Sequence, residues 1–420
     1  MRRTLLIATL IAVPVLMSGA TPADTVLTVQ GRASATPSIA ASGAFVAVAW
    51  TASMAGGATD VFLATSRNAG ETFGAAVRVN DVAGAASVSG EQPPRVVLLA
   101  RPGADPSIVV VWTAKAPSGT RVVSARSDDA GKSFGTARTI AGGDAAGNRG
   151  WESAAAAPDG RVLSVWLDHR ETVAAPGSGT AMAHDHLHMP KADGVAKAQL
   201  SKLYFSDGQG DARALAAGVC YCCKTSLAAA ADGSVYAVWR HVYPGNIRDI
   251  AFTLSRDGGR TFAAPIRVSE DRWAIDGCPE NGPALAVRGR DVHVMWPTLV
   301  GDAAGKEQAP ALFYAVSHDG RTFTPRLRMP TEGTPRHPQL TATPTGTLLA
   351  AWDEAANGTR RVIVGRAAPA AAVRFTRAVL ASGGTDQYPV VAAAGDGAIV
   401  AWVSGAAERS VIRVRRETPR

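Results

Sequence analysis

The chain has few charged residues, few aromatic residues and few cysteines. Its 420 residues include 19% charged side chains, 6% aromatic side chains and four cysteines, whereas 46% are apolar. That apolar content excludes a disordered chain, and the composition excludes collagen and coiled coils. The formal charge is +8, but the positive residues are scattered and form no Lys/Arg block. The surface is therefore basic, and we expect no nucleic-acid partner.

Long apolar runs are also missing, except at the N-terminus. There, Arg2 and Arg3 precede an apolar run over residues 5–17 and the small residues 18–20. This pattern predicts a signal peptide over residues 1–20 and a periplasmic or secreted protein. The run contains Pro14 and is shorter than the ~20 residues that span a bilayer, so we expect no membrane span. No cysteine stands near the cleavage site, which argues against a lipid anchor.

Glycine and proline are abundant, with 43 and 25 copies spread between short apolar runs. This distribution of turn-forming residues is typical of a chain with many turns between many strands and favours an all-β fold. Seven segments end in a β-rich run closed by tryptophan, at Trp50, Trp112, Trp166, Trp239, Trp296, Trp352 and Trp402. Most carry an apolar strand before the Trp strand and one or two strands after it. Repeated four-stranded units predict a single β-propeller domain over residues 21–420.

Four turns in these units share one motif: SRNAGETF from Ser66, SDDAGKSF from Ser127, SRDGGRTF from Ser255 and SHDGRTF from Ser317. The motif resembles the Asp box of the sialidase superfamily, S-x-D-x-G-x-T-[WF], so the chain is similar to a divergent member of that superfamily. Its Ser and Asp side chains are expected to bond turn amides, less well where Asn68 replaces Asp.

The number of blades is a separate prediction. Familiar sialidases have six blades, which stays the alternative, but seven Trp units predict seven. The last unit is one strand short, so we expect residues 25–30 to complete it beside residues 410–416.

The loops before the first strands and after the Trp strands should open on one face of the propeller. The cysteines fall on that face, in two neighbouring units, at Cys220, Cys222, Cys223 and Cys278. Disulfides in an oxidising compartment are one interpretation, with Cys278 bridged to a cysteine of the other unit because neighbouring Cys222 and Cys223 bond only with strain. The other is a thiolate cluster for copper or zinc. The spacing C-x-C-C is not that of a zinc finger, and no CxxCH haem motif is present.

A long insertion over residues 170–202 carries an alternating histidine tract. His184, His186 and His188 lie between Met182 and Met189. Two or three imidazoles beside a thioether suit copper or zinc, and a solvated loop with chance histidines is the plainer interpretation. We expect the insertion to close over the cysteines. The first functional hypothesis is therefore a soft-metal site at the channel mouth, with copper or zinc bound.

The resemblance itself implies a second hypothesis, an exo-sialidase-type glycoside hydrolase. Sialidases use three arginines on the substrate carboxylate, a Tyr nucleophile with a Glu partner, and an Asp acid/base. Unit one opens with Ala35-Thr36-Pro37, so the usual N-terminal arginine is missing. The implied residues are Arg149, Arg240 and Arg336 for the clamp, Tyr388 for the nucleophile, and Glu280 or Glu152 for its base.

A third hypothesis is a non-catalytic binding propeller with structural disulfides. Such a scaffold is expected to present an apolar or aromatic patch at its mouth. The sequence instead places charged and sulfur-containing residues there, so this hypothesis ranks below the other two. The sequence leaves open whether the protein is an enzyme.

Overall fold

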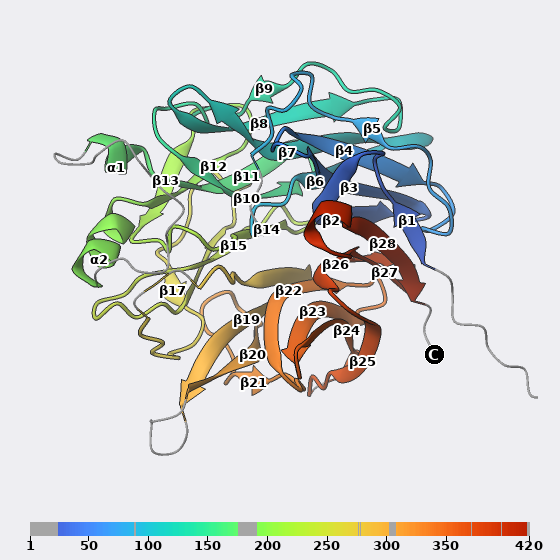
Figure 1. Ribbon diagram of the computed structural model, residues 1–420. Helices are drawn as coiled ribbons and strands as arrows, with labels where there is room; N and C mark the ends of the chain where they lie inside the picture. The colour runs from blue at the N-terminus through green and yellow to red at the C-terminus, as the bar shows by residue number, and fades with distance from the viewer. Residues whose placement is uncertain are drawn as a thin grey trace, which may run out of the picture.

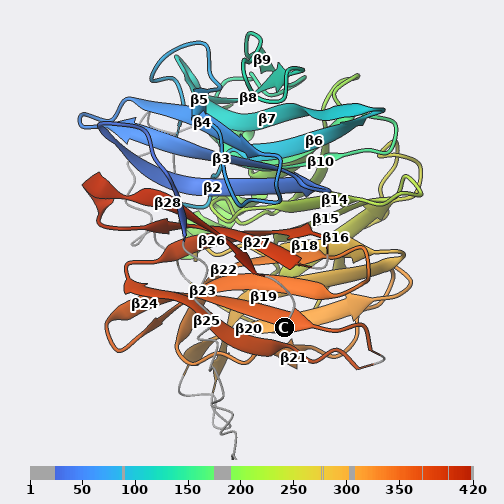
Figure 2. The same ribbon diagram turned by 90° about the vertical axis from the view of Figure 1, so that its right-hand side faces the viewer.

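The protein is a seven-bladed β-propeller. The computed structural model describes residues 24–87, 90–174, 191–275, 277, 279–301, 308–370, 372–395 and 397–417. Seven four-stranded antiparallel sheets form the blades (Figures 1 and 2). The predicted all-β fold and blade number are therefore confirmed, and the six-bladed alternative is wrong.

Each blade runs outward in chain order from its first strand, except the last. The first four blades contain β2 (Arg32–Ser42), β3 (Phe45–Met54), β4 (Thr59–Ser66) and β5 (Val77–Arg78); β6 (Arg95–Arg101), β7 (Ala104–Ala116), β8 (Gly119–Ser127) and β9 (Arg138–Thr139); β10 (Arg149–Ala156), β11 (Val162–Asp168), β12 (Lys202–Ser206) and β13 (Arg213–Ala217); and β14 (Ser226–Ala229), β15 (Val235–Arg240), β16 (Ile250–Ser255) and β17 (Ile266–Arg267).

The remaining three blades follow the same plan. They contain β18 (Ala284–Arg288), β19 (Asp291–Gly301), β20 (Gln308–Ser317) and β21 (Leu327–Arg328); β22 (Thr334–Ala342), β23 (Leu348–Ala356), β24 (Thr359–Ala367) and β25 (Thr376–Gly384); and β26 (Gln387–Ala394), β27 (Gly397–Ser404), β28 (Val411–Glu417) and β1 (Thr25–Leu27). Outside the strands, the described residues include α1 (Arg170–Ala174), α2 (Lys191–Gln199) and a 3₁₀ turn at Ala407–Arg409.

The seventh blade joins the two ends of the chain. Strand β1 pairs antiparallel with β28, and Thr25 faces Val414. Beside this pair, Arg415 Nε donates to Asp24 Oδ1 over 2.6 Å. The predicted closure is confirmed for residues 25–27, and it leaves the ring without an open blade edge.

The core is distributed between the blades. Each of seven apolar clusters joins two neighbouring blades, so side chains on one sheet face pack against the next sheet. Six of the seven repeat tryptophans have side chains that are fully buried: Trp50, Trp166, Trp239, Trp296, Trp352 and Trp402. The Trp periodicity in the sequence therefore reflects one buried anchor per blade.

The four motif turns are held by their own side chains. In the second copy, Ser127 Oγ accepts from Gly131 N at 2.8 Å, and Asp129 Oδ1 accepts from Ser133 N at 3.0 Å. Asn68 of the first copy makes an equivalent bond, since its Oδ1 accepts from Thr72 N at 3.0 Å. The amide oxygen therefore replaces the carboxylate, and the weaker turn expected at Asn68 is not seen in its hydrogen bonds.

Ring closure gives a first testable prediction. Leu27 is 6% exposed and packs in the cluster between the seventh and first blades. Leu27→Ala removes that contact, so we expect it to lower the free energy of unfolding by about 3 kcal/mol. Chemical denaturation measures the change. The control is Val26→Ala on the same strand, where Val26 is 46% exposed and the expected loss is under about 0.5 kcal/mol. Equal losses in both variants would contradict the role of β1 as a closing strand.

Among the described residues, neither helix has the length and apolarity required for a membrane crossing. Helix α2 instead belongs to the predicted insertion and lies against the propeller. Its Ala198 side chain is buried among Cys220, Tyr221 and Cys222. The end of the insertion therefore does contact the cysteine segment, as the sequence predicted for the insertion as a whole.

Candidate metal centre and axial pocket

Three cysteines form a buried cluster in the loop between β13 and β14. The Sγ atom of Cys220 lies 3.9 Å from that of Cys222 and 3.6 Å from that of Cys223. All three sulfurs lie within 4.8 Å of one another, and each residue is 1% exposed. The predicted clustering of these three residues is thus confirmed, and a buried group of three cysteines can hold a metal ion.

The loop is fixed by backbone bonds to the neighbouring strand and by the insertion. Cys220 N donates to Arg240 O at 2.9 Å. On the other side, the Lys197 ammonium of α2 stands 4.8 Å from the centre of the Tyr221 ring. The sulfur atoms are therefore held between strand β15 and helix α2, away from solvent.

Two arginines set the charge around the sulfurs. Arg248 Nη1 donates to Cys220 Sγ over 3.2 Å. Burial raises the pKa of Cys220, but the hydrogen bond from Cys223 and the charges of Arg248 and Arg240 outweigh it and lower the pKa to about 6. Burial and the neighbouring Cys220 thiolate raise the pKa of Cys223 well above its usual value. At neutral pH, Cys220 is therefore a thiolate and Cys223 a thiol.

The other predicted metal ligands lie outside the described residues. These are Cys278, His184, His186 and His188. Within the cluster, Cys220 and Cys223 are free thiols, and Cys222 is not counted among the free cysteines. The three described sulfurs therefore carry the structural argument for the site.

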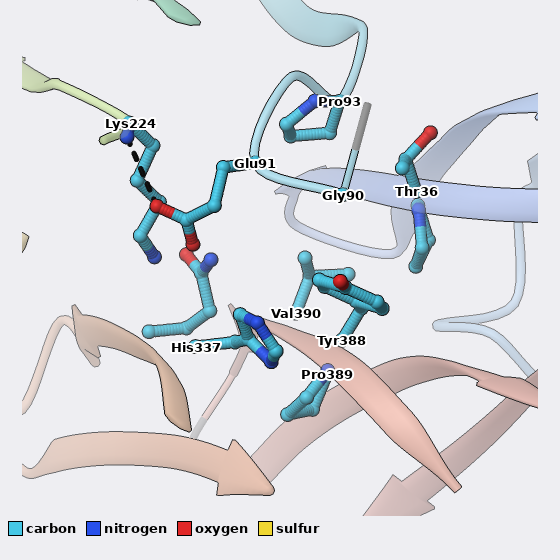
Figure 3. Close-up of a pocket in the computed structure, with 11 residues that line it drawn as sticks. Thr36, Gly90, Glu91, Pro93, Lys224, His337, Tyr388, Pro389 and Val390 are labelled. Atoms are coloured by element: carbon cyan, nitrogen blue, oxygen red, sulfur yellow. Dashed lines mark hydrogen bonds between the residues drawn. The ribbon is translucent and has the colours of Figure 1, made fainter. Parts of the chain in front are cut away.

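A narrow pocket lies beside the cysteine loop, where the first strands of several blades meet (Figure 3). The pocket and the open space at its mouth together measure about 280 Å³, most of it outside the narrow part. Glu91 lines the pocket beside Lys224, and its Oε2 accepts from Lys224 N at 2.9 Å and from Gly282 N at 2.8 Å. Lys224 is 4% exposed and its Nζ donates to Pro338 O at 2.5 Å. Burial lowers the pKa of Lys224 to about 8, although Glu91 opposes the shift.

Strand bulges direct other side chains of this pocket. The register of β22 slips between Arg336 and Gln339, and that of β26 slips between Gln387 and Val390. Within these bulges, His337 and Tyr388 have φ angles of 51°. Non-glycine residues rarely adopt this left-handed conformation, which is found at bulges that re-aim a side chain. Both side chains line the pocket as a result.

One carboxylate orients both of these residues. The Asp353 Oδ1 atom lies 2.5 Å from His337 Nδ1 and accepts a hydrogen bond from Tyr388 N at 3.3 Å. Arg360 Nη1 donates to Asp353 Oδ2 at 2.7 Å. The His337 and Tyr388 rings lie side by side, with centroids 4.0 Å apart (Figure 3). Burial, with Glu91 and Asp353 nearby, raises the pKa of Tyr388 to about 12, so its hydroxyl stays protonated at neutral pH.

The arginines of the sialidase hypothesis are placed differently from a shared clamp. Arg149 is buried and binds Asp168, and its guanidinium also donates to the carbonyls of Thr120 on β8 and of Ala146 in the loop before β10. Arg240 is buried too, and its Nη2 donates to Asn281 O and Pro297 O. Arg336 is exposed. Both buried guanidinium groups thus have protein carbonyls or a carboxylate where a substrate carboxylate would bind.

The two proposed glutamates also differ from their expected role. Glu152 is fully buried, accepts from Thr113 Oγ1 at 2.8 Å, and has a pKa raised by burial. Glu280 is exposed, and its charge contributes to the raised pKa of Tyr388. Tyr388 lines the pocket, as the sialidase hypothesis requires. The glutamate that lines it with Tyr388 is Glu91, however, and not Glu152 or Glu280.

Sequence reasoning missed Glu91 and Arg248. Glu91 stands just before the first strand of the second blade. Other blades supply polar residues to the mouth from the same place, so the position of Glu91 could have identified it as a candidate site residue. Arg248 lies between β15 and β16, eight residues beyond Arg240 in the chain. Nothing in the local sequence indicates that its side chain reaches Cys220.

Comparisons with known proteins support the fold. No protein-family model and no curated protein matches the chain. An α-L-arabinanase from Penicillium chrysogenum has 12% sequence identity and a TM-score of 0.52, with 94% of this chain and 98% of that chain covered. The polysaccharide lyase Uly1 has 12% identity and a TM-score of 0.53, with 91% and 90% covered. A PL25 ulvan lyase has 9% identity and a TM-score of 0.54, with 94% and 95% covered.

At these identities the likenesses show the fold alone. They agree with a β-propeller over nearly the whole chain, as the sequence predicted. The chemistry of this chain has to be argued from its own residues.

Proposed function

We propose that the protein binds a soft metal ion, copper(I) or zinc, through the thiolates of Cys220, Cys222 and Cys223. The observation that carries the proposal is the close packing of the three buried sulfur atoms. Thiolates favour copper(I) and zinc, whereas calcium and magnesium prefer oxygen ligands. No carboxylate or imidazole of a described residue belongs to the same group.

The charges around the cluster support a thiolate site. Three thiolates carry more negative charge than one copper(I) or zinc ion neutralises, and a buried excess charge is costly. Arg248 and Arg240 both lie close enough to lower the pKa of Cys220. Their positive charges offset the excess, so the protein environment suits a metal-bound trithiolate.

Export and the remaining ligands belong to the same proposal. We place the protein in the periplasm or outside the cell because of the predicted signal peptide over residues 1–20. His184, His186 and His188 are proposed to supplement the site, since the insertion that carries them leads into α2, which contacts the cluster. Imidazoles from a loop would add affinity to a site that the thiolates form.

A disulfide competes with the metal for Cys222. In an oxidising compartment we propose that Cys222 bridges to Cys278, which is supported by the fact that Cys220 and Cys223 are free thiols whereas Cys222 has a further interaction. The thiols of Cys220 and Cys223 then stay free. Reduction of the bridge would restore the full set of three thiolates.

Equilibrium dialysis tests the metal proposal. Reduced, metal-free wild-type protein is expected to take up one copper(I) or zinc ion tightly, and the Cys222→Ser/Cys223→Ser variant is expected to lose tight uptake. Replacing the three tract histidines by alanine should weaken binding without abolishing it. His318→Ala removes an exposed histidine far along the chain and serves as the matched control. Wild-type protein that binds neither ion more tightly than the serine variant would overturn the proposal.

An exo-sialidase activity is the second candidate, and it is supported only by Tyr388 in the axial pocket. The occupied Arg149 and Arg240 side chains argue against it. Hydrolysis of a fluorogenic sialoside discriminates the two: we expect none from the wild-type protein, and hydrolysis that Tyr388→Phe abolishes would favour the sialidase.

A further inference from the structure

The axial pocket contains a set of chemical groups that the metal proposal does not use. Its lining includes one carboxylate, one ammonium, one imidazole and one phenol, from Glu91, Lys224, His337 and Tyr388. These four residues come from four blades, so their convergence is a product of ring closure. We propose that this pocket is a second site, which removes a proton from the carbon next to a carboxylate and expels an alkoxide from the following carbon.

His337 is placed to act as the base. Its Nδ1 is hydrogen-bonded to Asp353. This carboxylate is fully buried and also accepts a hydrogen bond from Arg360. In the neutral ring, Nδ1–H therefore donates to the carboxylate and the lone pair lies on Nε2. No described residue bonds Nε2, which leaves it available to the pocket. A carboxylate that fixes the tautomer and orientation of an imidazole is the usual support for a general base.

Tyr388 is placed to act as the acid. Its ring lies against His337, and its hydroxyl has no hydrogen-bond partner among the described residues. The hydroxyl lies against Gly90, where a Cβ atom would stand 2.2 Å from Oη. Any larger residue at position 90 would displace the phenol. The backbone of the Glu91 loop is thus shaped around the hydroxyl.

Lys224 supplies the positive charge that such a reaction needs. Removing a proton next to a carboxylate places a second negative charge on its oxygens, and a cation held nearby stabilises the transition state. Lys224 lines the pocket, and its ammonium donates to the carbonyl oxygen of Pro338. Its remaining N–H bonds can donate to a ligand carboxylate.

The lining argues against hydrolysis by two carboxylates. A glycosidase of that type needs a pair of carboxyl groups on opposite sides of the bond. Among the residues that line this pocket, Glu91 is the one carboxylate, and two backbone N–H groups occupy its Oε2. One base, one acid and one cation instead match proton abstraction with elimination.

The proposed step balances without any co-reactant. His337 Nε2 takes the proton, the C–H electron pair forms a C=C bond, and the C–O bond on the next carbon breaks. The leaving oxygen takes the Tyr388 proton, and the proton on His337 then returns to the phenolate through water. Because the pocket is narrow, it admits the end of a molecule. The substrate class is therefore a small acid or a terminal uronate that bears an alkoxide leaving group.

The experiment uses 4-linked digalacturonate, whose reducing-end residue has the carboxylate, the adjacent C–H and the leaving oxygen. Chelator-treated wild-type protein is expected to release the unsaturated product, followed by the ultraviolet absorbance of its conjugated double bond. His337→Gln and Tyr388→Phe are each expected to lower the rate at least about 100-fold, the size typical of a lost general acid or base. Tyr204→Phe and His318→Gln remove a phenol and an imidazole elsewhere and are the matched controls.

Thermal unfolding and digalacturonate binding show whether each variant is folded. Variants that unfold at the wild-type temperature, still bind digalacturonate and form no product confirm the assigned roles. Absence of product from wild-type protein, even with saturable binding, would overturn the proposed reaction. Equal rates in wild-type protein and both site variants would overturn the assignment of His337 and Tyr388. Metal uptake is not needed for any of these outcomes, so the two sites succeed or fail separately.

Discussion

Arg248→Met is expected to raise the pKa of Cys220 from about 6 to above neutrality. The guanidinium of Arg248 donates directly to the Cys220 sulfur, and its charge is among the causes that overcome burial. Without it, a buried thiolate loses both a hydrogen bond and a counter-charge. The thiolate absorbance of reduced, metal-free protein, followed against pH, measures the shift.

Arg248→Lys is the matched control because it keeps the charge and loses the planar donor geometry. We expect its titration midpoint between those of wild type and Arg248→Met, and Cys220→Ser should remove the transition. The same midpoint in wild type and Arg248→Met would contradict the role of Arg248.

The lowered pKa also makes stability depend on pH. Cys220 titrates lower in the folded protein than at its ordinary value of 9.0. A group of this kind contributes stability that is fully present above its unfolded pKa and is lost as pH falls through its folded pKa. The stability gap between wild type and Arg248→Met should therefore be largest above pH 9 and should narrow as the pH falls towards 6.

Trp402→Phe is expected to destabilise the protein more than Trp50→Phe. Both tryptophans are fully buried at the same place in their blades. Trp402 Nε1 donates to Asp386 Oδ1 at 3.0 Å, whereas Trp50 Nε1 has no hydrogen-bond partner in the described structure. Trp402→Phe removes this donor from Asp386, whose carboxylate is 1% exposed. The loss should add about 1–3 kcal/mol to the destabilisation caused by the smaller ring.

Chemical denaturation of the two variants measures this difference directly. Because each replacement removes nearly the same apolar volume, the core contribution is matched between them. The additional variant Trp402→Phe/Asp386→Asn replaces the charge by an amide and should recover part of the loss. Equal destabilisation by the two Phe variants would show that the indole–carboxylate bond contributes nothing measurable.

The blade plan was predictable because it depends on short-range patterns. Every blade repeats a Trp strand and a Gly-rich turn, and both are visible in a single sequence. The closing pair of residues 25–27 and 412–414 followed from counting, since one unit lacked a strand. No single-residue detail was needed for either prediction.

The site was predictable only in part, because it depends on side-chain directions. Cys220, Cys222 and Cys223 are close in the chain, so their clustering required little from the fold. Arg149 and Arg240 stand at the predicted end of the blades, yet their side chains bind carbonyls there. The direction of a side chain depends on neighbours from other blades, which no local pattern contains.

The same limit applies to the axial pocket. His337 and Tyr388 reach it through bulges that put them at positive φ. The sequence resemblance singled out Tyr388 but gave no sign that Asp353 orients it together with His337. Glu91 binds backbone atoms of two other blades, so its role exists only in the closed ring.

The pairing of β1 with β28 imposes an order on how the protein is completed. Arg413 and Asp24 are 389 positions apart in the chain, yet they form an ion pair. During synthesis the earlier blades can form one after another, but the first segment has to wait, unpaired, until almost the last residue has emerged. A chain truncated before Ile412 therefore leaves β1 without a partner, and cellular quality control would meet an exposed strand at each end of the chain.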